Sequence, residues 1–227
     1  MIGHHGSSST STSANHPLKA PNGTSSRAWV FGYGSLTDLG ALARYLGRPP
    51  FRHGEFVHCH LEGWRRRWNV ARDNSRDVPG SGHYRDPRSG ERPPVMVTFL
   101  NIERQSSSRV NGVAFQVDRS QLRMIRRRES TYVMAEISRW LDTRLPGAVF
   151  GAVALPAAIE RCHSARATGQ ARVTTTYRQH VETAFRAHGD SWWGAYLDST
   201  DDIDIPVVDL ERVAPEPPRY RPLSKRD

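Results

Sequence analysis

The chain has 227 residues, enough for one domain with a substantial core or for two small ones. Its formal net charge is +9, nearly all of it from arginine, so acidic substrates or nucleic acid are conceivable partners, although a solvated arginine-rich surface is the simpler interpretation. Two distant cysteines, Cys59 and Cys162, argue against a disulfide framework and a cysteine-based zinc site, and no stretch is apolar for long enough to span a membrane.

Composition divides the chain into three parts. Residues 1–27 are rich in Ser, Thr, Gly and His and predict a disordered tail. Residues 28–212 predict one folded domain, and residues 213–227 predict a Pro- and Arg-rich C-terminal tail. Because the first residues lack the apolar run of a secretory signal, we expect a cytoplasmic protein.

The first half of the domain predicts mainly strands. An apolar run at 28–33 predicts a strand, and the spacing of leucine and alanine in 38–46 predicts a helix. A turn is predicted at Gly63, and the polar residues 73–94 predict a long loop. Four further segments predict strands, at 55–61, 64–71, 95–101 and 110–117.

The second half adds helices to this pattern. Asp118 and Gln121 predict a capping box at the start of a helix, and two strands are predicted at 131–138 and 147–155. Further helices are predicted from Pro156 and across 177–189, the second ended by a glycine. Strands followed by helices, without regular alternation, predict an α+β domain.

A glycine-rich turn joins the first predicted strand to the first predicted helix. Its sequence, FGYGSL at 31–36, lets backbone N–H groups approach an anion. A dinucleotide-binding fingerprint is disfavoured because Thr37 stands where the third glycine belongs, and Ser35 lacks the flanking glycines of a nucleophile elbow. Two interpretations of this turn stay open from these residues alone. In the functional one, both glycines make room for a ligand; in the structural one, the turn needs the glycines only for its own conformation.

A second motif, IRRRESTY at 125–132, follows the predicted capped helix. Together the two motifs resemble the γ-glutamylcyclotransferase-like family, with its AIG2/ChaC-type fold. The segments GWRRRWNVARDN at 63–74, VPGSGHYRD at 78–86 and VNGVAFQV at 110–117 are similar to further parts of that family, so the resemblance covers about residues 28–212. It implies a small closed, mixed or antiparallel β-barrel flanked by helices, with no metal or organic cofactor.

The resemblance also implies an activity on a small γ-glutamyl amine or amide. The α-amine of the substrate attacks its own γ-carbonyl, and the products are 5-oxoproline and a free amine. Glu129 is the implied general acid and base, and backbone N–H groups of the glycine-rich turn are implied donors to the substrate. The substrate-binding residues implied by the resemblance are Tyr33, Gly34, Ser35, Leu36 and Tyr132.

Several alternatives stay open at this point. By its neighbours alone, Glu129 is one end of a surface ion pair with Arg126–Arg128, and such a pair would lower its pKa. A related amide- or acyl-transfer enzyme, or a non-catalytic module that binds a ligand or nucleic acid, would use the same fold. The motif also departs from the family at Thr37-Asp38, where Asn or Met is frequent. The substrate, whether glutathione, a γ-glutamyl amino acid or a modified metabolite, and the oligomeric state are not predicted.

Two other groups of residues favour structural interpretations. His58 and His60 share one face of a predicted strand near His53, but no carboxylate or cysteine completes a metal site. The segment Trp64–Trp68 places both tryptophans and Arg66 on one face of a strand. A core-facing aromatic pair with solvated or pocket-facing arginines is favoured over a nucleic-acid surface, and an arginine of this run is a candidate for binding a substrate carboxylate.

Overall fold

The computed structural model of the chain describes residues 27–78 and 82–214. The strands are β1 (Ala28–Gly32), β2 (Phe56–Asp73), β3 (His83–Arg85), β4 (Met96–Val117), β5 (Tyr132–Glu136), β6 (Val149–Ala154), β7 (Ala171–Thr174), β8 (Val207–Val208) and β9 (Glu211–Val213). The helices are α1 (Leu39–Tyr45), α2 (Arg119–Arg128), α3 (Pro156–Ala167), α4 (Thr175–Arg186) and α5 (Asp190–Asp198), with short 3-10 turns η1 (Ser35–Thr37) and η2 (Ser138–Trp140). Apart from Arg27, Val213 and Ala214, the two predicted tails lie outside the described residues.

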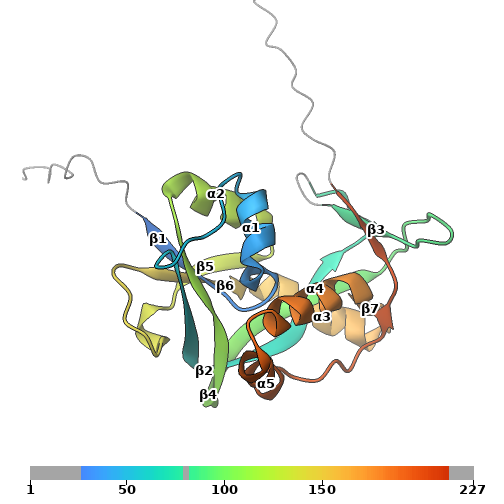
Figure 1. Ribbon diagram of the computed structural model, residues 1–227. Helices are drawn as coiled ribbons and strands as arrows, with labels where there is room; N and C mark the ends of the chain where they lie inside the picture. Colours follow the sequence, from blue (N-terminus) through green and yellow to red (C-terminus); the bar gives the residue numbers. More distant parts are fainter. Residues whose placement is uncertain (1–26, 79–81, 215–227) are drawn as a thin grey trace, which may run out of the picture.

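The predicted α+β class is confirmed, because helices surround one large mixed sheet (Figure 1). The strand order is β5-β6-β1-β4-β7-β8, and β2 pairs with the other edge of β4. β1 runs antiparallel to β4 and parallel to β6. Within the described residues no pairing joins β5 to β8, so closure of this sheet into a barrel stays a prediction.

Two long strands replace four predicted ones. β2 continues through the predicted turn at Gly63, which has φ 75° and lies at a shift of register between Glu62 and Trp64. Opposite this point, residues 105–108 of β4 lie between the paired Arg104 and Arg109. The predicted turn at Gly63 is therefore wrong, and residues 102–109 join the two strands predicted at 95–101 and 110–117 into one strand. Gly63 and residues 105–108 form a β-bulge, which bends paired strands without ending them.

The predicted long loop at 73–94 contains a short strand. β3 lies within it and pairs antiparallel with β9, so that Tyr84 stands opposite Arg212. This pairing, the β3–β9 ribbon, brings residues near the C-terminal end beside the loop, as the adjacent green and red segments of Figure 1 show. The P-G part of the loop, residues 79–81, lies outside the described residues.

The helices begin largely where the sequence predicts. The predicted capping box of α2 is confirmed, because the Asp118 carboxylate accepts from the Gln121 N–H at 2.9 Å and the Gln121 amide oxygen accepts from the Asp118 N–H at 3.1 Å. α4 ends at Arg186, before the predicted terminator Gly189. Gly189, with φ 102°, is instead the residue before α5, a helix that the sequence did not predict. Within the described ranges no helix has the length and hydrophobicity to cross a membrane.

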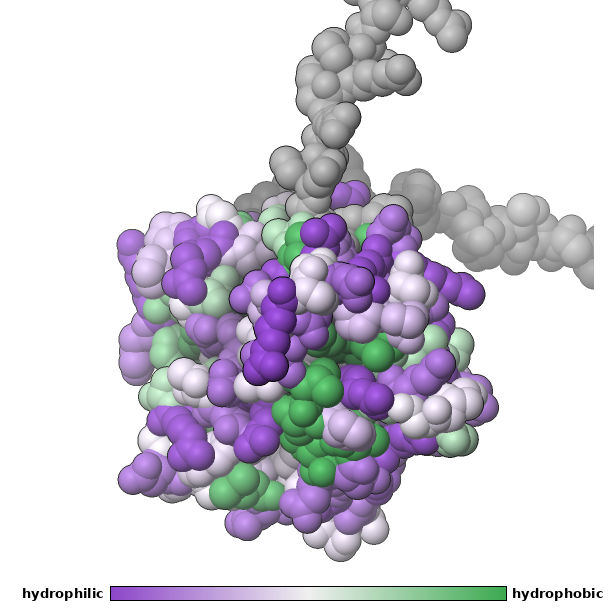
Figure 2. Space-filling view, turned by 90° about the vertical axis from the view of Figure 1, so that its right-hand side faces the viewer, coloured by the Kyte–Doolittle hydropathy of each residue, from purple (hydrophilic) through white to green (hydrophobic). Residues whose placement is uncertain are grey.

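Hydrophilic side chains cover most of the face drawn in Figure 2, and the largest group of hydrophobic side chains on it lies near the centre. The hydrophobic core lies behind this polar surface. Trp64 and Trp68 face that core as predicted, with 6% and 3% of their surfaces exposed. Arg66 lies between them along β2 and is completely buried, so the prediction of a solvated or pocket-facing arginine is wrong at this position.

Buried hydrogen-bond acceptors compensate the charge of Arg66. Its guanidinium donates to the Tyr33 carbonyl at 2.7 Å, to Ser199 Oγ at 2.6 Å, and to both the side chain and the carbonyl of Asn111. It also lies over the rings of Phe185 and Tyr196, at 4.7 and 5.0 Å from their centres. Burial lowers the pKa of Arg66 to about 9, which leaves the group charged at neutral pH. Arg66 thereby ties β4 and the end of α5 to Tyr33 of the glycine-rich turn.

Candidate active site

The glycine-rich turn folds tightly over the end of β1. A Cβ atom at Gly32 would lie 2.9 Å from the backbone of Leu36, too close for any other residue without a shift of the turn. The prediction that both glycines make room for a ligand is therefore wrong for Gly32, which accommodates its own chain.

Gly34 faces a different element. A Cβ atom there would lie 3.5 Å from the Tyr177 hydroxyl of α4, so this part of the turn looks toward the first turn of that helix. The Gly34 carbonyl accepts from the Thr37 N–H and hydroxyl, at 2.9 and 2.7 Å, and begins η1. Because the first N–H groups of such a helix have no acceptor within it, those of η1 are suited to bind an anion.

Glu129 occupies the C-terminal cap of α2. Its N–H donates to the Ile125 carbonyl at 2.9 Å, and its own carbonyl accepts from the Tyr132 N–H at 2.9 Å. The chain therefore reverses across Ser130 and Thr131 and enters β5 at Tyr132. The three preceding arginines in the last turn of α2 complement the negative end of the helix dipole.

Burial dominates the electrostatics of Glu129. Its side chain is 16% exposed, and Oε1 lies 3.2 Å from Arg128 Nε. Burial raises the pKa of the Glu129 carboxyl, and the charge of Arg128 lowers it by less, so the pKa lies above the ordinary value. The interpretation as a solvated surface ion pair does not fit this environment, although the ion pair itself exists.

Arg128 connects the two sequence motifs. While Nε contacts Glu129, Nη2 donates to Ser35 Oγ at 3.1 Å. Ser35 and Glu129 are more than 90 residues apart in the chain, yet the guanidinium of Arg128 contacts both. Glu129 and Ser35 therefore border a common space.

That space is a cavity of about 240 Å³. Of the predicted site residues, Ser35, Glu129 and Tyr132 line it, whereas Tyr33, Gly34 and Leu36 do not. The residues lining the cavity are Ser35, Arg72, Tyr84, Phe99, Arg128, Glu129, Ser130, Thr131, Tyr132, Thr176, Tyr177, His180 and Arg212.

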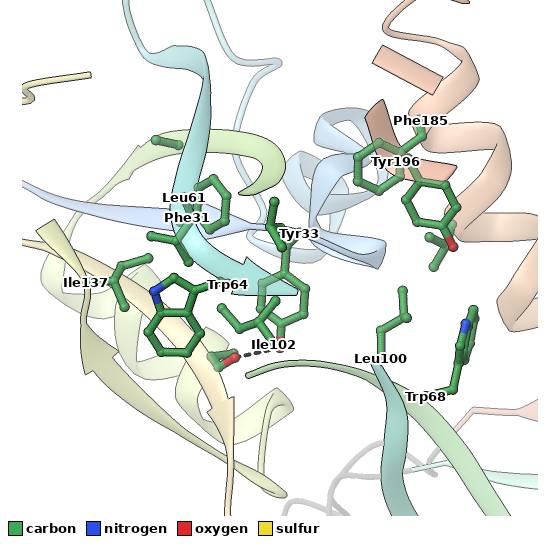
Figure 3. Packing of buried hydrophobic residues seen from close by; sticks show 14 of the residues in the cluster. Phe31, Tyr33, Leu61, Trp64, Trp68, Leu100, Ile102, Ile137, Phe185 and Tyr196 are labelled. Atoms are coloured by element: carbon green, nitrogen blue, oxygen red, sulfur yellow. Dashed lines mark hydrogen bonds between the residues drawn. The ribbon is translucent and has the colours of Figure 1, made fainter. Parts of the chain in front are cut away.

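Tyr33 and Leu36 belong to the core behind the cavity. The Tyr33 hydroxyl donates to the Ala152 carbonyl at 2.5 Å, and Figure 3 shows its ring among the buried residues around Ile102. Leu36 is 6% exposed and packs in a cluster with Val30. Both side chains therefore support the turn from behind and do not line the cavity.

Two tyrosines form part of the cavity wall near Glu129. The Tyr132 hydroxyl donates to the Leu100 carbonyl at 2.7 Å, and Tyr177 packs edge-on against Phe99 at 5.0 Å. Burial raises the pKa of both phenols, and the charge of Glu129 raises them further, so both stay protonated. Sequence reasoning missed Tyr177 because nothing in the pattern of α4 relates it to either motif.

The predicted strand histidines have local partners. His58 Nε2 lies 2.9 Å from His188 Nδ1, and His60 Nδ1 lies 2.9 Å from Asp142 Oδ2. Among the residues that the structure describes, no group of three or more His, Cys, Asp or Glu is arranged to hold a metal ion.

Comparison with known proteins gives one sequence match. A model of the ChaC-like protein family matches residues 28–144, which include Ser35, Arg72, Glu129 and Tyr132. The matched segment ends at residue 144, which is before both α4 and β9. Tyr177 of α4 and Arg212 of β9 therefore lie outside it. No curated protein sequence matches the chain significantly.

Several solved structures are similar at low sequence identity. One is a gamma-glutamyl cyclotransferase, with 11% identity, a TM-score of 0.48, and coverage of 81% of this chain and 94% of that chain. Another is a yeast gamma-glutamyl cyclotransferase specific to glutathione, with 13% identity, a TM-score of 0.43, and coverage of 77% and 95%. The uncharacterized human protein loc79017 has 12% identity, a TM-score of 0.44, and coverage of 80% and 94%.

Proposed function

The chain belongs to the ChaC-like, γ-glutamylcyclotransferase-like family, and on that premise we propose that it converts a γ-glutamyl amine or amide into 5-oxoproline and a free amine. The observation that carries this proposal is the largely buried Glu129 carboxyl, whose raised pKa suits proton transfer and which lines one cavity together with Ser35 of the glycine-rich turn.

Glu129 serves as the base in the first step. It takes a proton from the α-ammonium of the substrate, and the freed amine attacks the γ-carbonyl carbon to form a five-membered ring. This attack is intramolecular, so a cavity that holds the chain folded back supplies much of the acceleration. N–H groups of Gly34, Ser35 or Leu36 stabilise the negative charge that develops on the γ-oxygen.

Glu129 serves as the acid in the second step. The protonated carboxyl gives its proton to the leaving nitrogen as the carbon–nitrogen bond breaks. The carboxylate then takes the second proton from the ring nitrogen and passes it to the freed amine, which leaves as an ammonium, so atoms and charge balance without water or a cofactor. A carboxyl with a raised pKa accepts and returns a proton more readily than a fully solvated one at neutral pH. Ser35 and Arg128 are the nearest groups for the α-carboxylate, which is attached to the same carbon as the attacking amine.

A product assay tests this proposal. The purified protein is incubated with glutathione, γ-glutamyl amino acids and γ-glutamyl amines, and 5-oxoproline and the freed amine are quantified by mass spectrometry. We expect equimolar release of both products from at least one substrate, above the rate without protein. Release of glutamate in place of 5-oxoproline would show that the protein is a hydrolase. Transfer of the γ-glutamyl group to an added amine would show that it is an acyl-transfer enzyme.

The pH dependence of the reaction provides a separate prediction. Because the base form of Glu129 starts the reaction, kcat/KM is lost as the pH falls through a pKa that lies above the ordinary glutamate value of about 4.3. Arg128→Gln removes the charge that lowers this pKa. In a plot of kcat/KM against pH, the acid limb of this variant therefore lies at higher pH than that of the unmodified protein. The matched control is Arg126→Gln, an exposed arginine of the same helix turn that does not line the cavity. An acid limb that stays in place, or moves to lower pH, in Arg128→Gln contradicts the assignment.

A further inference from the structure

Helix α2 presents a strongly basic face to solvent. Four exposed arginines lie along it: Arg119, Arg123, Arg126 and Arg127. Successive residues of an α-helix are turned by about 100°, so these spacings place all four side chains within an arc of about 100°. The other side of the helix carries Ile125, which is completely buried in the core. The four arginines form the α2 basic face, which points away from that core.

No carboxylate neutralises the α2 basic face. Within residues 27–78 and 82–214, none of its four arginines forms an ion pair. Asp118 is committed to the helix cap: the hydrogen bond from the Gln121 N–H does most to lower its pKa, and the charge of Arg123 does least. Glu129, at the other end of α2, lines the cavity.

The remaining segments of the chain do not supply the missing negative charge. Residues 1–26 and 79–81 contain no Asp or Glu. Residues 215–227 contain two acidic and four basic residues, so their formal side-chain charge is also positive. A negatively charged partner for the α2 basic face therefore has to come from outside this chain.

Helix α1 adds a further positive charge beside α2 (Figure 1). The Tyr45 hydroxyl donates to the Met124 carbonyl at 3.1 Å, which joins the two helices. Arg44, the residue before Tyr45, is exposed and forms no ion pair with the part of the chain that the structure describes. The basic surface therefore covers more than one helix.

The arginines of the α2 basic face repel one another. Arg119 and Arg123 are four residues apart, as are Arg123 and Arg127, and like charges at this spacing destabilise a helix. Neutral glutamine has nearly the same helix propensity as arginine, so the helix itself does not need these charges. A polyanion bound along the face would remove the repulsion.

The chemistry of the face suits the phosphates of a nucleic acid. The planar fork of a guanidinium matches the oxygens of a phosphate group. Arg119 and Arg127 lie about 12 Å apart along the helix axis, a length over which a duplex carries several phosphates. The formal net charge of +9 attracts such a polyanion to the protein as a whole.

Two other kinds of partner suit the face less well. A helix that lies in a membrane surface buries its apolar side among the lipids, but Leu122 and Ile125 of α2 pack inside the protein against Leu42. A protein interface has an apolar centre, but among the described residues none of the exposed large hydrophobic side chains belongs to α2.

We propose that the α2 basic face, with Arg44 beside it, binds nucleic acid through the phosphate backbone without reading its sequence. None of these arginines lines the cavity, so this inference does not depend on the proposed reaction. It adds a macromolecular partner to a protein whose cavity is suited to a small molecule.

Salt-dependent binding tests the proposal. Fluorescence anisotropy measures the affinity of the full chain for a labelled DNA duplex and a labelled single-stranded RNA, each of two unrelated sequences. We expect a Kd of roughly 10⁻⁴–10⁻⁶ M at physiological salt, the same for both sequences. For the duplex, log K should fall against log salt with a slope of about −3 to −4, because each contacted phosphate contributes about 0.9.

The double variant Arg123→Gln/Arg127→Gln locates the surface. Its slope should be less steep by about two, and its affinity at low salt about tenfold lower or less. Both side chains are exposed and the change removes like-charge pairs, so we expect unchanged circular dichroism and a thermal midpoint no lower than that of the unmodified protein. Release of 5-oxoproline, where the unmodified protein shows it, should stay unchanged.

Arg85→Gln/Arg88→Gln is the matched control. It removes the same charge from two exposed arginines that form no ion pair with described residues and lie outside α2. Its slope should equal that of the unmodified protein.

Three results would overturn the proposal. One is no binding to either nucleic acid at low salt, and another is an equal loss of affinity in both double variants, which would mean that net charge alone is responsible. The third is binding to phosphatidylserine vesicles or to polyglutamate that is as tight and depends equally on Arg123 and Arg127.

Discussion

Glu129→Gln will lower kcat for 5-oxoproline release by roughly 10²–10⁴-fold, the usual contribution of a positioned general acid and base. Glutamine has nearly the same shape and fills the same place beside Arg128, but it cannot accept the proton of the substrate ammonium. Because the neutral amide also removes a buried charge, we expect the stability of the variant to equal or exceed that of the unmodified protein. Single-turnover product formation measures the loss, and circular dichroism checks the fold.

Glu160→Gln is the matched control for this loss. Glu160 is an exposed carboxylate of α3 that does not line the cavity, so its replacement should leave kcat unchanged. Substrate binding to Glu129→Gln, measured by calorimetry, should persist, since the α-carboxylate contacts remain. Full turnover by Glu129→Gln on a substrate of the unmodified protein would show that another group transfers the proton.

Arg66→Met will lower the free energy of unfolding by about 2–4 kcal/mol. The methionine fills part of the space but leaves the buried carbonyls of Tyr33 and Asn111 without donors, at about 1–3 kcal/mol each. The variant also loses the contacts of the guanidinium with the rings of Phe185 and Tyr196. Relief of the desolvation that lowers the Arg66 pKa offsets a part of this cost. Urea denaturation monitored by tryptophan fluorescence measures the change.

The neighbouring Arg67 provides a control on the same strand. Its side chain is 36% exposed and pairs with Glu103 and Asp201, so Arg67→Met should cost at most about 1 kcal/mol. An Arg66→Met protein as stable as the unmodified one would mean that the acceptors around Arg66 find other partners. In that case Arg66 would not be the residue that holds the turn before Gly34.

Local signals in the sequence predicted α1 to α4 and the class of the fold, but not α5. The capping box at Asp118 and the proline at the start of α3 act within one helical turn, and both appear where predicted. The long strands were predicted less well, because the bulge at Gly63 has the local composition of a turn. Only pairing along the whole of β2 and β4 distinguishes a bulge from a turn there.

The two motifs of the sequence indicated the family and gave six candidate residues. Ser35, Glu129 and Tyr132 line the cavity, whereas Tyr33, Gly34 and Leu36 do not. The sequence also predicted that both tryptophans of β2 face the core, because alternation along a strand is a property of the backbone. These features depend on neighbours in the chain, which is why one sequence was sufficient to find them.

The tertiary structure alone decided the chemistry of the site. Whether Glu129 is a solvated ion-pair partner or a buried carboxyl with a raised pKa depends on what packs over the end of α2, and that packing comes from distant segments. The same holds for Arg66, whose acceptors are Tyr33, Asn111 and Ser199, and for the wall of the cavity, where Arg72 of β2 and Arg212 of β9 meet. Burial and charge proximity are properties of contacts between segments, so no local pattern of residues encodes them.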